Sequence, residues 1–303
     1  MVDAKQVKQL REQTGAGMMD CKKALAECSG NISDAADWLR KKGIAAAAKK
    51  GSRVAAEGLI ALRVNDNKAF IAEINSETDF VAKNDSFKEL SSSVLDAISI
   101  SETNEVSELI INGKPSNEAL TNAISVIGEN IQLRRFARVS EDSGFVGSYL
   151  HGAVSDALGR IGVLVSISCD KISEEAKLLG KQIAMHVAAN KPVAANQEEV
   201  PAELVAKERE IFSDQAKASG KPESIIEKMV EGRVRKYYQE VVLVEQAFVL
   251  DGKTPIKEVI AEFEKSNDCN FKINSFTRYE VGEGIEKSAG DFADEVQSIV
   301  ANS

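Results

Sequence analysis

Hydrophobic residues follow a helical spacing at the start of the chain and a strand-like spacing further along it. Between residues 3 and 43, apolar positions three or four apart are interrupted at Gly15-Ala16-Gly17 and again at Gly30. Helices commonly end at a glycine, so this pattern predicts three short helices. Each would bury little surface alone. We therefore expect residues 1–50 to form a small three-helix module of the ubiquitin-associated type.

The middle of the chain repeats a strand-strand-helix pattern. In the first copy, β-branched segments at 58–64 and 69–74 flank the turn residues Asn65-Asp66-Asn67, and a helix is predicted over 87–100. The second copy has strands at 147–153 and 161–167 and a helix at 174–189. The repetition predicts an α+β fold with two similar core subdomains, residues 51–139 and residues 140–190 with 241–281. The loop at 154–159 is expected to be disordered at its tip.

A charged, helix-forming segment, residues 191–240, interrupts the second copy. Helices predicted over 203–218 and 223–239, on either side of Ser219-Gly220-Lys221-Pro222, would form an inserted antiparallel hairpin like a short coiled coil. The expected seam residues are Leu204, Ile211, Ile226, Met229, Val230 and Val234. Strands are predicted at 241–250 and 271–281, around a helix at 254–265. A C-terminal helical module, residues 282–303, with a helix over 289–300, follows.

Residues 74–84, Ile-Asn-Ser-Glu-Thr-Asp-Phe-Val-Ala-Lys-Asn, place an acid beside a phenyl ring at a strand-to-helix corner. A rigid corner can present Asp79 and Phe80 to a partner. A purely structural interpretation is also available. In it, Thr78 caps the following helix, Asp79 complements the helix dipole and Phe80 enters the core.

Composition and charge exclude several classes of function. The chain has 303 residues, of which 43% are hydrophobic and 28% charged, as in ordinary globular proteins. The net charge of −9 disfavours a general nucleic-acid binder, which needs a basic surface. No apolar run reaches the ~18 residues of a membrane span, and acidic residues near the start fit neither a signal nor a transit peptide. These features predict a cytoplasmic protein with no membrane partner.

Motifs for catalysis, metals and nucleotides are missing from the sequence. Four cysteines show no zinc-ligand spacing, and His151 and His186 have no nucleophile motif beside them. No glycine-rich loop has the residues of a phosphate-binding site. We therefore expect no catalytic residue, no metal, no cofactor and no direct nucleotide binding.

Two further segments allow alternative interpretations. Met18 and Met19 could fill the core of the module or form an adaptable apolar contact surface. The basic segment at 45–53 could contact RNA, but it lacks interleaved aromatic residues that would stack on bases, which favours a solvated connector helix.

Motifs spread over the whole chain resemble those of the translation elongation factor Ts family. They are the run Leu10-Arg11-Glu12, continued by Thr14 to Leu25, the segment Glu77 to Asn84, and more diffuse matches at 183–189, 227–233 and 279–287. The chain departs from the common family pattern at Leu150 and in the longer loop at 154–158.

The resemblance implies a guanine-nucleotide exchange factor for the GTPase elongation factor Tu, which is not itself an enzyme. It implies that Thr78, Asp79, Phe80 and Val81 disturb the magnesium site of the GTPase. It also implies further partner contacts, which fall here on Leu10, Arg11, Met18, Met19 and His151. Whether two such chains pair in the complex, and what the helical hairpin contacts, stay open.

Three other functions remain as alternatives. The N-terminal module could bind ubiquitin or a peptide, with the rest as scaffold. His151 or His186 could act as a general base in an enzyme, and residues 40–53 could bind RNA. The first alternative gives no reason for the segment from Thr78 to Asn84. Neither histidine lies in a nucleophile motif, and the net charge disfavours RNA binding.

Overall fold

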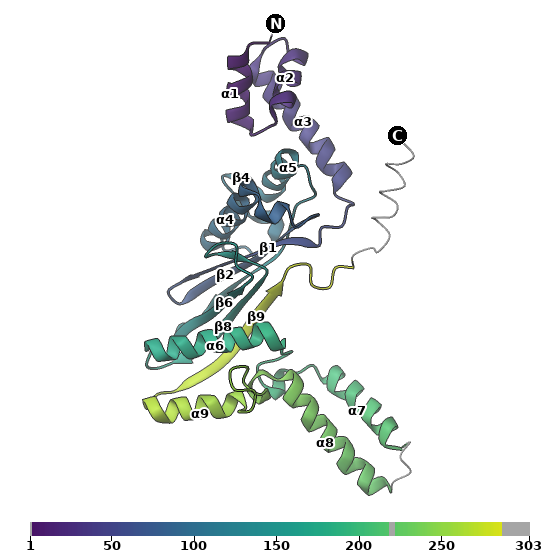
Figure 1. Ribbon diagram of the computed structural model, residues 1–303, viewed down its shortest axis with the longest axis vertical. Coiled ribbons are helices and arrows are strands. Elements are labelled where there is room, and N and C mark those ends of the chain that lie inside the picture. Colours follow the sequence, from purple (N-terminus) through teal and green to yellow (C-terminus); the bar gives the residue numbers. More distant parts are fainter. Residues whose placement is uncertain (1, 218–221, 287–303) are drawn as a thin grey trace.

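The computed structural model describes residues 2–217 and 222–286, which form an elongated arrangement of helices and antiparallel sheets (Figure 1). The predicted mixture of helix and sheet, an α+β class, is confirmed. The predicted C-terminal helix at 289–300 and the hairpin tip at 219–221 lie outside the described residues. The domain boundaries proposed from the sequence stay predictions. No helix in the described ranges combines the length and the apolar character needed to cross a membrane.

The N-terminal helices are α1 (Ala4–Thr14), α2 (Met18–Glu27) and α3 (Ile32–Lys50). Asp3 and Gln6 form a capping box that starts α1, and Gly15, with a φ of 68°, ends it in the left-handed conformation. Their shared core consists of Leu10, Cys21, Ala24, Leu25, Ala35 and Leu39. The basic segment predicted as a connector helix continues α3 without a break as far as Lys50.

The first sheet has the strand order β5-β2-β1-β7. Its strands are β1 (Glu57–Asn65), β2 (Lys68–Ser76), β5 (Gln132–Ser140) and β7 (Leu158–Gly159). The predicted hairpin of β1 and β2 is confirmed, and Asp66 takes a positive φ of 53° in its turn. Strand β5 was not predicted. The loop expected to be disordered instead supplies β7, which pairs with β1 and buries Leu158, so that prediction is wrong.

Alternate residues of β1 and β2 face two different cores. One face packs against α4 (Asp85–Ile100) and α5 (Ser116–Ile127) through residues that include Leu59, Ala61, Phe70, Ala72 and Ile74. The opposite face packs against the second sheet through Ile60, Leu62, Ala69 and Ile71. Between α4 and α5 lie the short elements η2 (Val106–Glu108), β3 (Ile110–Ile111) and β4 (Lys114–Pro115).

The second sheet has the strand order β6-β8-β9. Its strands are β6 (Gly144–His151), β8 (Ile161–Cys169) and β9 (Phe271–Glu280), covered by α6 (Glu174–Asn190) and α9 (Ile256–Asn267). A Cβ at Gly147 would lie 2.8 Å from the carbonyl oxygen of Gly180, so glycine is needed where β6 meets α6. The molecule is therefore built in layers, with helices outside two sheets that face each other (Figure 1).

The helices α7 (Ala202–Lys217) and α8 (Glu223–Val241) project from one end of the molecule (Figure 1). Their seam is formed by Ala216, Val230 and Val234, with Val205, Phe212, Ile226, Met229 and Tyr238 at its edges. Leu204 and Ile211, expected in this seam, are each 39% exposed, and the neighbouring residues Val205 and Phe212 take their place.

The predicted strand at 241–250 is also wrong. Helix α8 continues to Val241, and η4 (Leu243–Glu245) follows it. The backbone of this segment makes only isolated bridges, such as Ala194 with Val242 and Ala247 with Pro255. The short helix η3 (Gln197–Glu199) precedes α7.

Candidate partner-binding site

The corner after β2 exposes an aromatic side chain to solvent. Strand β2 ends at Ser76, a short helix η1 (Val81–Lys83) follows, and α4 begins at Asp85. Phe80 is 75% exposed, and the side chain of Asp79 beside it is 55% exposed. Val81 and Ala82 are buried in the core under α4 and anchor the segment. The corner therefore presents the acid and the phenyl ring while the next two residues fix the backbone.

The purely structural interpretation of this segment is wrong. Phe80 does not enter the core, because three quarters of its surface is exposed. Thr78 does not cap α4. Asn84 does so, since its side-chain oxygen accepts a hydrogen bond of 2.9 Å from the amide of Ser86. The residue that caps α4 is therefore the one directly before the helix.

Glu129 holds Thr78 with both carboxylate oxygens. The Thr78 amide donates to Oε2 at 2.9 Å, and the Thr78 hydroxyl donates to Oε1 at 2.6 Å. The hydroxyl of Ser76 donates to the carbonyl oxygen of Thr78 at 3.0 Å. Hydrogen bonds to an ionised acceptor are stronger than neutral ones. The backbone immediately before Asp79 is therefore fixed by the loop that follows α5.

A second set of contacts holds the preceding residue. Oε1 of Glu77 accepts from the amide of Asn130 at 2.6 Å, and Oε2 lies 3.2 Å from the guanidinium of Arg53. The Asn130 side chain donates to the carbonyl oxygen of Arg53 at 2.8 Å. Asn130 is almost fully buried. These contacts join three segments next to the exposed pair, namely those that follow α3, β2 and α5.

Lys83 lies close to both members of the pair. Its Nζ lies 4.0 Å from Oδ2 of Asp79 and 5.9 Å from the centre of the Phe80 ring. Both side chains of this ion pair are more than half exposed. Exposed ion pairs contribute little free energy, so Asp79 can exchange Lys83 for another partner at small cost.

A buried carboxylate fixes β2 just before the corner. Glu73 is fully buried and accepts hydrogen bonds from Arg134 at 3.0 Å, Arg135 at 2.7 Å and the amide of Gly282 at 2.9 Å. Burial alone would raise the pKa of Glu73, but the hydrogen bonds from Gly282, Asn75 and the two arginines together lower it. Glu73 is therefore ionised and ties β2 to β5 and to the segment after β9.

Helix α3 of the N-terminal helices contacts α5 and the loop after it, which in turn holds the corner. A Cβ at Gly43 would lie 2.4 Å from Oγ of Ser125, so α3 and α5 approach closely at this glycine. The ammonium of Lys50 donates to the carbonyl oxygen of Gly128, the residue before Glu129. This junction was not predicted, because it joins segments that are distant in sequence.

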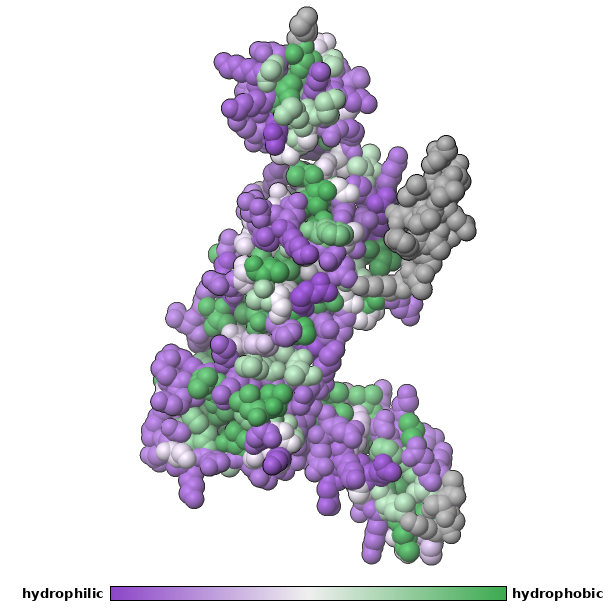
Figure 2. All heavy atoms as spheres, in the orientation of Figure 1, coloured by the Kyte–Doolittle hydropathy of each residue, from purple (hydrophilic) through white to green (hydrophobic). Residues whose placement is uncertain are grey.

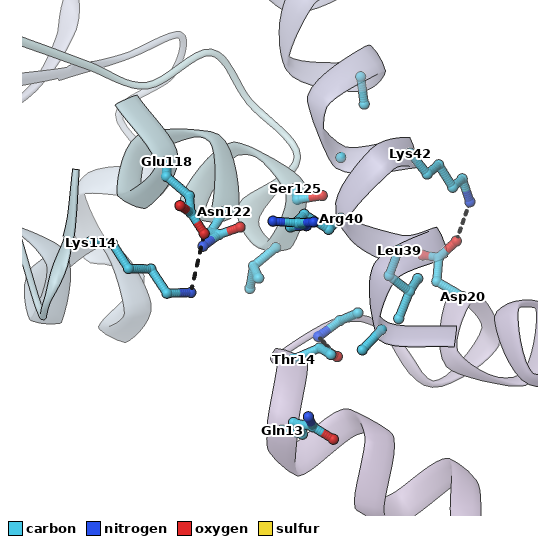
Figure 3. Close-up of a pocket in the computed structure, with 15 residues that line it drawn as sticks. Gln13, Thr14, Asp20, Leu39, Arg40, Lys42, Lys114, Glu118, Asn122 and Ser125 are labelled. Carbon is cyan, nitrogen blue, oxygen red and sulfur yellow. Dashed lines mark hydrogen bonds and ion pairs between the residues drawn. The ribbon is translucent and has the colours of Figure 1, made fainter. Parts of the chain in front are cut away.

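A cleft of about 510 Å³ opens beside this junction, between the N-terminal helices and α5 (Figure 3). Figure 3 shows Arg40 of α3 lying between its walls. Lys42 pairs with Asp20 on one wall at 2.6 Å, and Lys114 lies 4.0 Å from Glu118 on the other. These two ion pairs form within each wall, so neither one closes the cleft.

The other predicted contact residues lie on different surfaces. Met18 and Met19 on α2 are 59% and 75% exposed, and Arg11 on α1 is exposed. Figure 2 shows hydrophobic atoms gathered in a stripe on the visible face of the N-terminal helices. Leu10 is fully buried in the core of these helices, so it supports their surface and does not form it.

His151 ends β6 and is exposed, with its Nδ1 3.1 Å from the hydroxyl of Tyr149. Figure 1 places α2 at one end of the long axis and β6 near its middle. The candidate residues thus form one continuous segment at the corner and two further surfaces away from it.

Comparison with known proteins identifies the family. The family model for "Elongation factor TS" matches residues 77–283. The chain is 49% identical over 304 residues to elongation factor Ts of Bartonella tribocorum, covering 99% of both chains. It is 48% identical to that of Rhodospirillum centenum over 98% of both chains, and 49% identical to that of Brucella ovis over 97%. The chain therefore belongs to the elongation factor Ts family, which acts in translation elongation.

Proposed function

We propose that this chain is a guanine-nucleotide exchange factor for elongation factor Tu, and that it promotes release of GDP by disturbing the magnesium and phosphate site of the GTPase. The observation that carries the proposal is the exposed pair of Asp79 and Phe80 on a fixed corner. An exposed phenyl ring on a rigid mount is the kind of anchor that dominates protein interfaces.

The two side chains can act on such a site in different ways. Mg²⁺ is a hard cation that bridges phosphate oxygens and is among the largest charges in a GTPase site. Phe80 would insert as an apolar wedge and displace a segment of the GTPase. Asp79 would bring a negative charge close to that region. Val81 and Thr78 keep both side chains in place, because one is buried and the other is bound by Glu129.

Exchange by this route requires no bond to be made or broken by the factor. Suppose that a protein binds the nucleotide-free GTPase more tightly than it binds the nucleotide-bound GTPase. This protein lowers the affinity of the GTPase for nucleotide, and nucleotide lowers the affinity of the GTPase for this protein to the same extent. Nucleotide can then rebind and expel the factor. The chain accordingly needs no catalytic group, cofactor or bound nucleotide for this function, and acts as a binding protein.

Further contacts would come from the exposed surface of α2 at Met18 and Met19, from Arg11, and from His151. Methionine side chains adapt to irregular partner surfaces. Contacts at separated surfaces would let the molecule grip the GTPase while the corner acts on the nucleotide site. We place this activity in the cytoplasm, without nucleic acid or membrane as a partner, and leave open whether two chains pair in the complex.

The direct test follows release of a fluorescent GDP from purified elongation factor Tu. Adding this protein at a small fraction of the GTPase concentration should accelerate release many times over, because each molecule is expelled and used again. An unchanged release rate, with the protein shown to be folded, would contradict the proposal.

A second test concerns the isolated chain. Calorimetric titration with GDP or GTP should show no saturable binding in the micromolar range, because the sequence has no loop that cradles phosphates. Saturable binding of either nucleotide would mean that the chain has a nucleotide site of its own.

A further inference from the structure

Two thiols and a carboxylate meet at the end of β8 opposite the start of β9. Over the described residues, one group of three potential metal ligands has its donor atoms within 4.8 Å of one another, namely Cys169, Asp170 and Cys269. Cys169 is the last residue of β8, and Cys269 lies two residues before β9. The cysteines are a hundred positions apart, so no spacing motif in the sequence indicates them.

Both cysteines are free thiols in this structure. Cys169 pairs with Phe271 in the antiparallel ladder, and Cys269 lies two residues before β9, outside that ladder. The sulfur atoms of the two cysteines lie within 4.8 Å of each other. One metal ion can bind two sulfur atoms at such a separation, because each Zn–S bond is about 2.3 Å long.

Asp170 is held in place by Asn270. The Asn270 amide donates to Oδ1 at 2.9 Å, and its side-chain nitrogen donates to Oδ2 at 2.7 Å. These hydrogen bonds lower the pKa of Asp170 and keep it ionised. Metal-ligating carboxylates are commonly oriented in this way by an outer set of hydrogen bonds, and each oxygen retains a lone pair for a cation.

Negative charge would accumulate here once the thiols ionise. Burial, and then the proximity of Cys169 and Asp170, raise the pKa of Cys269. The nearby ammonium of Lys171 hydrogen-bonds with Asp268, at 3.0 Å from its carboxylate. Cys169 is buried, Cys269 is half-buried and Asp170 is exposed, so the group opens to solvent on the carboxylate side.

We propose that Cys169, Asp170 and Cys269 bind a thiophilic divalent cation, with Zn²⁺ as the natural candidate and water in the fourth position. Binding forms two metal–sulfur bonds and one metal–oxygen bond, and the two thiols release their protons to solvent. The ion joins the end of β8 to the segment between α9 and β9. It plays no part in nucleotide exchange, so this proposal stands apart from the proposed function.

The test uses the full-length protein, fully reduced, with Cd²⁺ and Zn²⁺ as probes. Cd²⁺ should produce the ultraviolet charge-transfer band of cadmium–thiolate bonds at one ion per chain. Zn²⁺ affinity is measured by competition with a chromophoric chelator. Cys269→Ser should weaken Zn²⁺ binding by at least about 100-fold, since removing an outer-sphere partner alone costs about 10–100-fold. Asn270→Ala should weaken it by about 10-fold.

Cys28→Ser is the matched control. Cys28 is also half-buried and is located at the end of α2, so its removal should leave both the Cd²⁺ band and the Zn²⁺ affinity unchanged. A Cd²⁺ band that persists in Cys269→Ser, or that disappears in Cys28→Ser, would overturn the proposal. The proposal would also be overturned if the reduced protein bound neither Cd²⁺ nor Zn²⁺. This holds even if mass spectrometry finds a Cys169–Cys269 disulfide after air oxidation.

Discussion

The two strand-strand-helix units of this molecule differ most where strand turns into helix. In the first unit, β2 is joined to α4 by residues 77–84, which include a short helix and expose Phe80. In the second, β8 is joined to α6 by residues 170–173, and Ser173 caps the helix directly. Both hairpins are antiparallel and both helices pack on their own sheets. The repeated elements are alike, and the connections are not.

The acid at each corner has different surroundings. Asp170 accepts two hydrogen bonds from Asn270, whereas the contact of Asp79 within the described residues is the long, exposed ion pair with Lys83. At the first corner the fixing carboxylates are Glu77 and Glu129, and they leave Asp79 available. The comparison shows that a repeated scaffold can support different tasks when its corners are held by different residues.

The strongest test of this difference replaces both exposed residues of the first corner. Asp79→Ala/Phe80→Ala should slow stimulated GDP release by about 30-fold or more, because loss of an aromatic interface anchor typically costs about 2 kcal/mol. The melting temperature should stay close to that of the wild type, since Phe80 is 75% exposed and contributes little to the core. Release is measured with fluorescent GDP, and melting by circular dichroism.

Ile172→Ala at the second corner is the control for this variant, because Ile172 is 50% exposed at the corresponding place. It should leave exchange unchanged. A double variant with wild-type exchange and melting would falsify the proposed action of the pair. Equal losses at both corners would instead mean that exposed apolar surface, and not the particular pair, drives binding.

A smaller effect is expected from loosening the corner without touching the pair. Glu129→Ala removes the acceptor of both Thr78 hydrogen bonds, and leaving two donors unpaired should cost about 1–3 kcal/mol of local stability. We expect the maximal rate of GDP release to fall by about 3–10-fold, and the affinity for the GTPase to fall less. Glu129→Gln, which keeps one acceptor oxygen, should recover part of the rate.

Ser173→Ala makes the corresponding change at the second corner. It removes the cap of α6 and should lower overall stability by about 1 kcal/mol. Exchange should be unaffected. If Ser173→Ala slowed release as much as Glu129→Ala, the effect of Glu129 would be attributable to general stability and not to positioning of Asp79.

The sequence predicts elements whose partners are close along the chain. The turn at Asn65-Asp66-Asn67 sets the first hairpin, and glycines end α1 and separate it from α2. Strand β5, which was not predicted, contains three arginines. They are satisfied by tertiary partners, with Arg134 and Arg135 on Glu73 and Arg138 on backbone carbonyls of other segments.

The site residues that the sequence predicts are likewise those that lie close together along the chain. Asp79 and Phe80 stand out in the sequence because the motif is continuous. Glu129 lies 51 positions after Thr78, and no local pattern connects the two. The seam of α7 was misplaced by one residue, since helical spacing alone does not determine which of two adjacent apolar residues meets the partner helix. Cys169 and Cys269 are close because β8 pairs with β9, and no local sequence pattern indicates this pairing.

The last expected effect is a difference between the helices of the two units in how their stability depends on pH. Helix α6 carries the fully buried His186, whose Nδ1 accepts from the amide of Val249 at 3.1 Å. Its Nε2 therefore carries the proton and donates to the side-chain oxygen of Gln246 at 2.8 Å. Burial lowers the pKa of His186, and the bond to Gln246 opposes this only in part. Helix α4 contains no histidine.

The sign of the pH effect follows from this lowered pKa. Below the ordinary histidine pKa of about 6.5, the unfolded chain binds a proton that the native chain resists, so stability falls as the pH decreases and levels off below the native pKa. Between about pH 7.5 and pH 5.5 the loss is at most about 1.4 kcal/mol, measured by urea denaturation. Hydrogen exchange should accelerate at α6 and Val249 more than at α4. The loss should persist in His151→Gln, which removes the exposed histidine; its disappearance in that variant, or an equal response of α4, would show that His186 is not the group responsible.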